Sequence, residues 1–471
     1  MGYEMTIGLE THVELSTKTK IFCSCTTEFG GDPNTHCCPV CIGLPGSLPK
    51  LNRAVVEYAV KAGLATNCEI GYTSKMDRKN YVYPDLSKAY QISQLDYPLC
   101  KNGHMTLSDG QTIRLNRIHI EEDAGKLVHS GNDTNVDYNR GGVPLIEIVT
   151  EPDFHSAQQV REYLENLRLI MKTLDVSDCK MQEGSMRCDV NISIRRTGDK
   201  KLGTRTEIKN MNSLSFISKA IESEYNRQVD ALECGEQIIQ ETRRFNESTG
   251  ETESMRGKED SNDYRYFGDP DLPIVYISPE EVEQLRASMP ELPDQKQVRY
   301  MREYGLSDGD SMQIIRYTKL ALYYEKMVDV SGAPKLAANL LITQLFRVLE
   351  DEEAKENASL PIPAEYIGEV LKLVNEGKIS NNFIKKILDE MLEKQKPFAE
   401  LFKISDFSMA DESETESFVD AAIAESAAAV QDYLAGKEKA IFAIIGKVMK
   451  ASKGKADAKT VEEMIIKKIK N

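Results

Sequence analysis

The chain has 471 residues, 41% of them hydrophobic, and a formal net charge of −16. This length is typical of about three domains, and the acidic balance argues against indiscriminate nucleic-acid binding while allowing a local basic face. No apolar run approaches the roughly 20 residues of a membrane helix, and no signal or transit segment precedes the first strand-like run, so we expect a cytoplasmic protein with reduced thiols.

Up to about residue 290, short β-type runs alternate with turn residues, and a few helical stretches interrupt them. The predicted strands are Glu4–Leu15, Arg114–Glu122, Gly142–Thr150, Met186–Ile194 and Thr204–Lys209, and the predicted helices are Asn52–Ala65, Ser156–Leu174 and Ser213–Leu232. Strands that dominate without alternating strictly with helices indicate an α+β domain with a largely antiparallel sheet.

Two prolines near Met289–Asp294 precede a change to helical composition. The next predicted helices are Gln295–Tyr304, Lys335–Leu349, Ala364–Glu376 and Asn381–Lys394, and a small bundle follows with Glu414–Ala427, Ala428–Leu434, Ala440–Ser452 and Thr460–Ile469. We therefore expect domains at 1–293, 294–405 and 406–471. From Lys437 onward the sequence contains ten lysines and only four carboxylates. The simplest interpretation of this basic segment is a solvated helix surface.

Four cysteines have the spacing of a metal site. Cys23 and Cys25 are followed, after a polar loop, by Cys38 and Cys41, and two such pairs can place four thiolates tetrahedrally around zinc. The alternative is a set of buried, inert thiols, and the neighbouring Cys37 and His36 could compete as ligands. With four ligands filled, the predicted zinc site is structural rather than catalytic.

Every histidine lies between His12 and His155, and three predicted strands combine carboxylates with histidines. Because side chains alternate along a strand, each strand places a polar set on one face: Glu10, His12 and Glu14 on the first, His119, Glu121 and Asp123 on the second, and Glu147 within the apolar third. A hard, oxygen-rich set suits Mg²⁺ or Mn²⁺. A solvated outer face of an antiparallel sheet is the alternative.

Basic groups accompany these carboxylates. Arg78 and Lys79 open the donor-rich stretch Asp77–Asp85, while Arg187 and Asp189 share one face of a later strand. Cations beside metal-binding carboxylates are what phosphoryl transfer requires. No Walker P-loop or kinase-type glycine loop is present in the sequence, so the type of any nucleotide site stays open at this level.

Longer motifs resemble a known family, the B subunits of the tRNA-dependent amidotransferases. The matching stretches are IGLETHVEL at Ile7–Leu15, DRKNYVYPDLSKAYQISQ at Asp77–Gln94, EEDAGK at Glu121–Lys126, VPLIEIVTEPD at Val143–Asp153, EGSMRCDVNISI at Glu183–Ile194, ETRRF at Glu241–Phe245, DYRYF at Asp263–Phe267, PELPD at Pro290–Asp294 and IIGKVMKASKGKADAK at Ile444–Lys459. They extend over essentially the whole chain.

The resemblance implies a subunit of a heterotrimeric ligase that corrects misacylated Glu-tRNA(Gln) or Asp-tRNA(Asn). Such a subunit uses ATP and Mg²⁺ to phosphorylate the side-chain carboxylate, which ammonia from a glutaminase A subunit then converts to the amide, and a small C subunit ties the assembly together. The implied fold is a cradle-like α+β catalytic domain, a helical linker and a helical tail that contacts tRNA.

By position, the resemblance also implies roles for single residues. His12, Glu121 and Glu147 correspond to Mg²⁺ ligands, with Glu10 and Lys79 also catalytic. The residues implied to lie around ATP or the acyl phosphate are Arg78, Lys79, Arg187 and Asp189. The implied zinc ligands, which some family members have, are Cys23, Cys25, Cys38 and Cys41. The residues implied to contact tRNA are Lys447, Lys450, Lys453 and Lys455.

Two other functions are compatible with the same residues. The chain could be a non-catalytic, zinc-stapled tRNA-binding subunit whose acidic strands are structural. It could also be a metal-dependent hydrolase or nuclease, which would cleave RNA or an ester with Mg²⁺ and without ATP.

Overall fold

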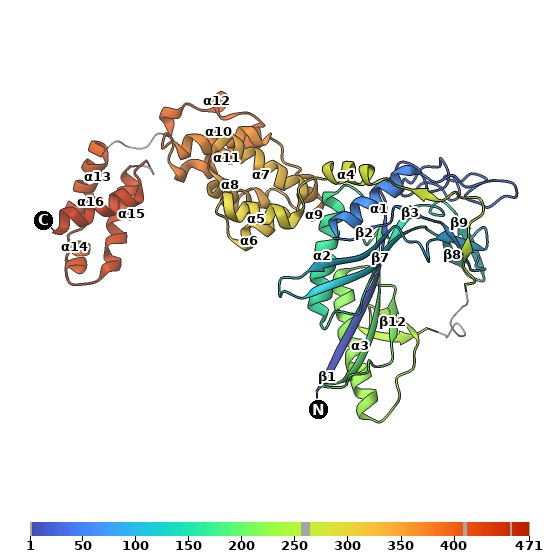
Figure 1. The fold of residues 1–471 in the computed structure, drawn as a ribbon. Coiled ribbons are helices and arrows are strands. Elements are labelled where there is room, and N and C mark those ends of the chain that lie inside the picture. The colour runs from blue at the N-terminus through green and yellow to red at the C-terminus, as the bar shows by residue number, and fades with distance from the viewer. Residues whose placement is uncertain (1, 256–263, 408–411, 453–454, 471) are drawn as a thin grey trace. The chain divides into compact units, whose positions relative to one another are not determined.

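The computed structural model describes residues 2–255, 264–407, 412–452 and 455–470. The chain divides into two compact units, Met1–Pro293 and Asp294–Asn471 (Figure 1); the expected three-domain division stays a prediction. Among the described residues, none of the helices combines the length and the apolar character needed to cross a bilayer.

A nine-stranded sheet forms the centre of the first unit, in the order β14-β13-β12-β11-β1-β10-β7-β6-β2. Its strands are β1 (Tyr3–Glu14), β2 (Glu69–Ile70), β6 (Cys100–Thr106), β7 (Thr112–Glu122), β10 (Pro144–Thr150), β11 (Met186–Arg196), β12 (Thr206–Lys209), β13 (Thr242–Asn246) and β14 (Glu251–Ser254). Every neighbouring pair is antiparallel except β12 and β13. The expected α+β fold with a largely antiparallel sheet is confirmed.

Three smaller sheets extend from the first unit. The three-stranded sheet β15-β4-β5 joins β15 (Phe267–Gly268), β4 (Asp77–Asn80) and β5 (Tyr90–Ser93). Two further pairs are β16 (Val275–Tyr276) with β3 (Thr73–Ser74), and the hairpin of β8 (Lys126–Ser130) and β9 (Asp133–Asp137).

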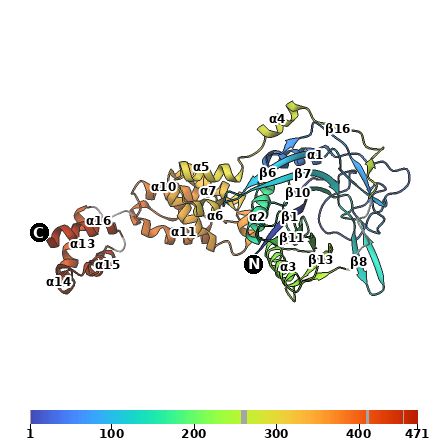
Figure 2. The same ribbon diagram turned by 60° about the horizontal axis from the view of Figure 1, so that its bottom comes forward.

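Helices cover the apolar face of the large sheet, as Figure 2 shows for α2 and α3. The first unit contains α1 (Arg53–Ala65), α2 (Ala157–Thr173), α3 (Leu214–Glu233) and α4 (Pro279–Ala287). Leu9 and Val13 of β1 are at most 1% exposed and share one hydrophobic core with Tyr163 and Leu167 of α2. Because successive side chains of a strand point to opposite faces, His12 and Glu14 of β1 lie on the face that these helices do not cover.

All regular elements among the described residues of the second unit are helices. It begins with α5 (Pro293–Glu303), α6 (Asp308–Ile315), α7 (Thr318–Ser331), α8 (Pro334–Thr343), α9 (Glu352–Asn357), α10 (Ala364–Asn375), α11 (Ile384–Lys394) and α12 (Phe398–Leu401). It ends with α13 (Glu412–Ala424), α14 (Ala427–Leu434), α15 (Ile441–Ala451) and α16 (Ala458–Lys470). Val419, Ile444, Val448 and Ile465 are fully buried in a core that the last helices share.

Two predicted helices are interrupted. The stretch Lys335–Leu349 is helical only to Thr343 and continues as a 3₁₀ turn at Leu345–Arg347. The stretch Asn381–Lys394 likewise opens with a 3₁₀ turn at Asn381–Phe383. The apolar pattern persists through both turns, so periodicity alone did not separate them.

Candidate functional site

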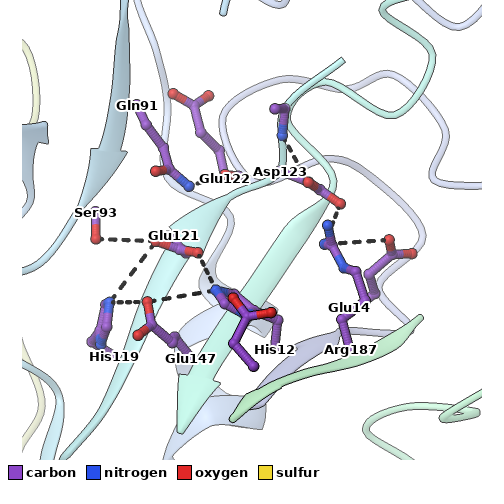
Figure 3. Close-up of polar contacts among 12 residues, drawn as sticks. His12, Glu14, Gln91, Ser93, His119, Glu121, Glu122, Asp123, Glu147 and Arg187 are labelled. Carbon is purple, nitrogen blue, oxygen red and sulfur yellow. Dashed lines mark hydrogen bonds and ion pairs between the residues drawn. The ribbon is translucent and has the colours of Figure 1, made fainter. Parts of the chain in front are cut away.

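Cross-strand pairing brings the predicted metal ligands together on the uncovered face of the sheet. His12 of β1 lies opposite Glu147 of β10, and Glu147 lies opposite His119 of β7. Glu121 follows two residues after His119 and therefore points to the same face. Four side chains from three adjacent strands thus meet at one point (Figure 3).

The distances fit a small divalent cation. His12 Nε2 lies 3.4 Å from Glu121 Oε1 and 3.6 Å from Glu147 Oε2. Adjacent ligands of an octahedral Mg²⁺ with bonds of about 2.1 Å are separated by about 3.0 Å, so small side-chain shifts would close the set around the ion. One ligand atom from each of the three residues lies within 4.8 Å of the other two. The donor set can hold a metal ion.

The electrostatics of this cluster favour a cation. Burial lowers the pKa of His12, but Glu121 and Glu147 outweigh it and raise that pKa to about 10. Burial raises the pKa of Glu147, yet His119 and His12 hold it well below its usual range. Positive charge beside Glu147 therefore stabilises its ionised form.

His119 and Ser93 were not among the predicted ligands, yet both contact the acidic pair. His119 Nε2 lies 3.3 Å from Glu147 Oε2, and Ser93 Oγ donates to Glu121 Oε2 at 3.3 Å. Arg117 Nε donates to His119 Nδ1 at 3.4 Å, so the ring proton sits on Nε2 and points toward Glu147. The alternation that placed His119 on the face of Glu121 was the only signal in the sequence.

A second acidic cluster lies beside the first on β1, β11 and β12. Glu10, Asp189 and Glu207 place one oxygen each within 4.8 Å of one another. Lys209 Nζ lies 2.9 Å from Asp189 Oδ2 and 3.0 Å from Glu207 Oε1. Burial and the nearby Glu147 raise the pKa of Glu10. Asp189, predicted near phosphate, therefore belongs to this cluster.

The predicted basic residues separate into two groups. Lys79 lies close enough to Glu121 and Glu147 for their charges to raise its pKa against the effect of burial. Arg78, one residue earlier on β4, points away and pairs with Asp269 at 2.8 Å and Asp271 at 2.8 Å. Arg187 lies beside the acidic site and forms an ion pair with Asp123 at 2.6 Å.

The four predicted zinc ligands converge. Cys41 Sγ lies 3.7 Å from Cys23 Sγ and 3.6 Å from both Cys25 Sγ and Cys38 Sγ. A tetrahedron with Zn–S bonds of about 2.3 Å has edges of about 3.8 Å, so the thiols can hold a metal ion. Cys37 Sγ instead contacts Asn139 Oδ1 at 3.8 Å. Gly43 and Gly46 both take a positive φ after the last ligand, which turns the chain tightly there.

The cysteine loop is connected to the acidic site. Ser87 Oγ donates to the Cys41 carbonyl at 2.8 Å, and Lys88 Nζ pairs with both oxygens of Glu122, at 2.7 Å and 2.6 Å. Ile92 N–H also donates to Glu122, at 2.9 Å. Since Glu122 and Glu121 are neighbours on β7, these contacts hold the segment after the cysteines against the end of β7.

The predicted tRNA-contacting lysines lie in the tail. Lys447 and Lys450 are exposed on α15, and Lys455 is half-buried before α16. Lys453 lies outside the described residues. Lys447 Nζ donates to the Glu425 carbonyl at 2.7 Å, so part of its hydrogen-bonding capacity is used within the tail.

The first unit is therefore an α+β domain that presents a histidine–carboxylate cluster, able to hold a cation, on the open face of a sheet. Family models match at residues 5–283, described as "GatB/GatE catalytic domain", and at residues 322–469, described as "GatB domain". The first match alone covers more than half of the chain. The chain belongs to the GatB family, the B subunits of the tRNA-dependent amidotransferases.

Curated relatives are similar over their full lengths. A protein of Caldicellulosiruptor saccharolyticus, named as the B subunit of the aspartyl/glutamyl-tRNA(Asn/Gln) amidotransferase, is 49% identical over 473 residues, covering 99% of this chain and 98% of its own. Proteins of the same name from Carboxydothermus hydrogenoformans (49% identity, 99% of each chain) and Geotalea daltonii (47%, 100% of each chain) are similarly close. Together with the family matches, they confirm the resemblance predicted from the motifs.

Proposed function

We propose that this chain is the subunit that activates the side-chain carboxylate of misacylated Glu-tRNA(Gln), Asp-tRNA(Asn) or both, with ATP and Mg²⁺. The observation that carries the proposal is the convergence of His12, Glu121 and Glu147 beside Lys79. The tRNA substrates are proposed from the names of the relatives, and the reaction is proposed from the residues of the site.

The reaction has two balanced steps. A carboxylate oxygen of the aminoacyl group attacks the γ-phosphorus of ATP, the bond to the β-γ bridging oxygen breaks, and ADP leaves with an acyl phosphate formed. Ammonia then attacks the acyl carbon, phosphate leaves, and the nitrogen loses a proton to give the amide. The overall class is an ATP-dependent carbon–nitrogen ligase with glutamine as the amido donor, EC 6.3.5.-.

The residues of this chain take distinct parts. His12, Glu121 and Glu147 would hold Mg²⁺, which supplies neutralisation of the phosphate oxygens when bound. His119 and Ser93 orient the two carboxylates through the contacts described above. Lys79 provides a cation for the charge that develops on the transferred phosphoryl group, and Arg187 and Asp189 border the same face, with Glu10 next to His12.

The partners follow from the family. We propose a heterotrimer in which a glutaminase A subunit supplies ammonia and a small C subunit links the two, in the cytoplasm. Lys447, Lys450, Lys453 and Lys455 are proposed to contact tRNA phosphates. Cys23, Cys25, Cys38 and Cys41 are proposed to bind zinc in a structural role, since the four thiols leave no position for a substrate.

The test is tRNA-dependent ATP hydrolysis by the chain co-purified with its A and C partners, given Mg²⁺, ammonium and Glu-tRNA(Gln) or Asp-tRNA(Asn). We expect ADP and amidated aminoacyl-tRNA, with the preferred tRNA identifying the substrate. Glu121→Gln and Glu147→Gln should abolish ADP formation while tRNA binding persists. Tight tRNA binding without ADP from the unaltered assembly would instead identify a non-catalytic tRNA-binding protein. RNA or ester cleavage without ATP would identify a hydrolase.

A further inference from the structure

Four tyrosines form a continuous series of ring contacts at the tip of the small sheet β15-β4-β5. Tyr81 stacks on Tyr83 with centroids 5.7 Å apart and planes inclined by 24°. Tyr81 meets Tyr264 edge-on at 6.1 Å, and Tyr264 meets Tyr266 edge-on at 6.2 Å. Two segments that are distant in the sequence therefore build one aromatic cluster.

This tyrosine cluster adjoins the acidic site. Lys79 Nζ lies 4.9 Å from the centroid of the Tyr264 ring. Lys79 is paired with Gln91 across β4 and β5, and Ser93, two residues further along β5, donates to Glu121 Oε2 at 3.3 Å. Lys79 is thus the common neighbour of the carboxylates and of the aromatic rings. A molecule that reacts beside Lys79 has these rings within reach.

The rings are held in place but are not buried in the core. Tyr83 is 40% exposed and Val82 beside it is 82% exposed, whereas Tyr163, Tyr300 and Tyr324 are fully buried. Exposed aromatic rings whose backbone is held in place are suited to stacking on a ligand, since little conformational freedom is lost on binding.

The backbone of the cluster is fixed from both segments. Asn80 N–H donates to the Tyr264 carbonyl at 3.0 Å, and Asn80 Nδ2 donates to the Arg265 carbonyl at 2.7 Å. Tyr81 N–H donates to the Ala89 carbonyl at 3.1 Å. Arg265 has a φ of +43°, a conformation that non-glycine residues rarely adopt and that concentrates at ligand-binding sites.

We infer that the tyrosine cluster stacks the unpaired bases at the 3′ end of the tRNA substrate, with the terminal adenine on Tyr83 and Tyr81. The inference rests on the proposed function, because the side-chain carboxylate to be activated belongs to an amino acid whose α-carboxyl group is esterified to that terminal adenosine. Once the carboxylate lies beside Lys79, the adenine can lie only a ribose and a short side chain away. Single-stranded RNA is bound through successive bases on aromatic side chains, and a series of four rings suits such a strand better than the single base of ATP.

The experiment compares intact aminoacyl-tRNA with the same tRNA lacking its last two 3′ nucleotides, bound to the complete three-subunit assembly. Variants are Tyr83→Ala, Tyr83→Phe and, as a matched control, Tyr276→Ala, whose ring is 67% exposed on β16. We expect Tyr83→Ala to weaken binding of the intact tRNA about tenfold, in the range measured when one stacked aromatic ring is removed. Tyr83→Phe should restore it, and Tyr276→Ala should leave it unchanged.

Two further measurements, the binding of trimmed tRNA and the KM for ATP, test whether the rings act on the 3′ end alone. Binding of trimmed tRNA should be the same for all variants, and the KM for ATP should not move. Equal weakening of intact and trimmed tRNA would overturn the inference, as would a raised KM for ATP with unchanged tRNA binding, which would assign the rings to the nucleotide. An assembly that binds the intact 3′ end through Tyr83 yet forms no ADP would contradict the proposed function and leave this inference standing.

Discussion

Adjacent residues on β4 serve different purposes because they point to opposite faces. Lys79 lies beside the carboxylates of the acidic site, whereas Arg78 is bound to Asp269, whose side chain is fully buried. We expect Lys79→Met to lower the rate of ATP-dependent phosphorylation by about 100-fold, the usual effect of removing one preorganised cation or donor, with the unfolding free energy nearly unchanged. The measurement is single-turnover ADP formation alongside chemical denaturation.

Arg78→Met serves as the contrasting variant. Removing the guanidinium leaves the carboxylate of Asp269 buried without its partner, which we expect to cost about 2–3 kcal/mol of unfolding free energy after allowance for the partial exposure of Arg78. If Arg78→Met abolished phosphorylation at full stability and Lys79→Met reduced only stability, the two roles would be exchanged.

At the scale of single residues, the sequence predicted which face a side chain occupies but not its neighbours. Period-two alternation placed Glu10, His12 and Glu14 on one face of β1, where Glu10 and His12 belong to different clusters, and spacing alone grouped the cysteines. The pairing of Glu147 with both His12 and His119 depends on the register of strands from distant parts of the chain, which a single sequence does not contain. The ion pair of Lys88 with Glu122 was missed for the same reason.

We expect disruption of the cysteine loop to change the structure of residues outside the loop as well as within it. Cys38→Ser removes one of four converging thiols, so we expect zinc content to fall from about one per chain to well below it. Cys37→Ser should retain zinc, because its sulfur contacts Asn139 rather than the cluster. Metal analysis of protein purified without chelator decides this, and equal zinc in both variants would disprove the ligand set.

Loss of the ion should also loosen the segment that follows. Ser87 and Lys88 join the cysteine loop to β7, so hydrogen exchange of the amides in residues 81–93 should rise in Cys38→Ser and stay unchanged in Cys37→Ser. If hydrogen exchange rose only within the cysteine loop itself, the contacts of Ser87 and Lys88 would not stabilise residues 81–93.

A buried carboxylate couples α3 to β13 and β14 and gives the first unit a defined acid response. Glu224 accepts from Arg227 and Gln228 on α3 and from Thr252 on β14. Its Oε2 also lies 3.3 Å from Arg243 Nε on β13. Burial raises its pKa, but these bonds outweigh burial, and the pKa in the folded protein is lower than the usual 4.5. The stabilisation is therefore complete above about pH 4.5 and is lost as the pH falls through the lower, folded value.

Glu224→Gln tests this. We expect it to reduce stability by about 1–3 kcal/mol at neutral pH and to weaken the loss of stability below about pH 4.5, as followed by urea unfolding across about pH 3–7. The exposed Glu222 on the same helix provides the control Glu222→Gln. An acid response of Glu224→Gln identical to that of the unaltered protein would place the responsible group elsewhere.

Local capping chemistry explains where three of the predicted helices begin in the structure. The predictions for α1, α2 and α3 began one residue early, because Asn52, Ser156 and Ser213 are the capping residues, whose side chains accept from the first turn. Helix α7 was missed. Its capping position is Tyr317, whose side chain makes no capping hydrogen bond. Helices α4 and α6 were missed as well although Ser278 and Ser307 cap them, so capping residues alone did not decide which helices were found.

For the whole molecule, tRNA binding should depend on charge in the tail. We expect the combined variant Lys447→Gln, Lys450→Gln and Lys455→Gln to weaken tRNA binding, and the slope of log affinity against log salt to become shallower by about 0.7–0.9 for each phosphate that is no longer neutralised. Lys437→Gln is the control, because Lys437 is ion-paired with Asp432 at 2.9 Å. A combined variant with an unaltered slope would mean that the lysines form only a solvated surface.

The position of β1 has a consequence for how the protein is made. This strand is synthesised before the other eight yet is the middle strand of the nine, and its two neighbours end at Thr150 and Arg196. At translation rates of about 5–20 residues per second, roughly 10–40 s separate the synthesis of β1 from that of its last partner. Until Thr150 is made both edges of β1 lack their partners, and until Arg196 is made one edge still does; an unpaired strand edge is prone to aggregation. We therefore expect faster elongation up to Arg196 to raise the soluble yield, because it shortens the time for which β1 has an unpaired edge.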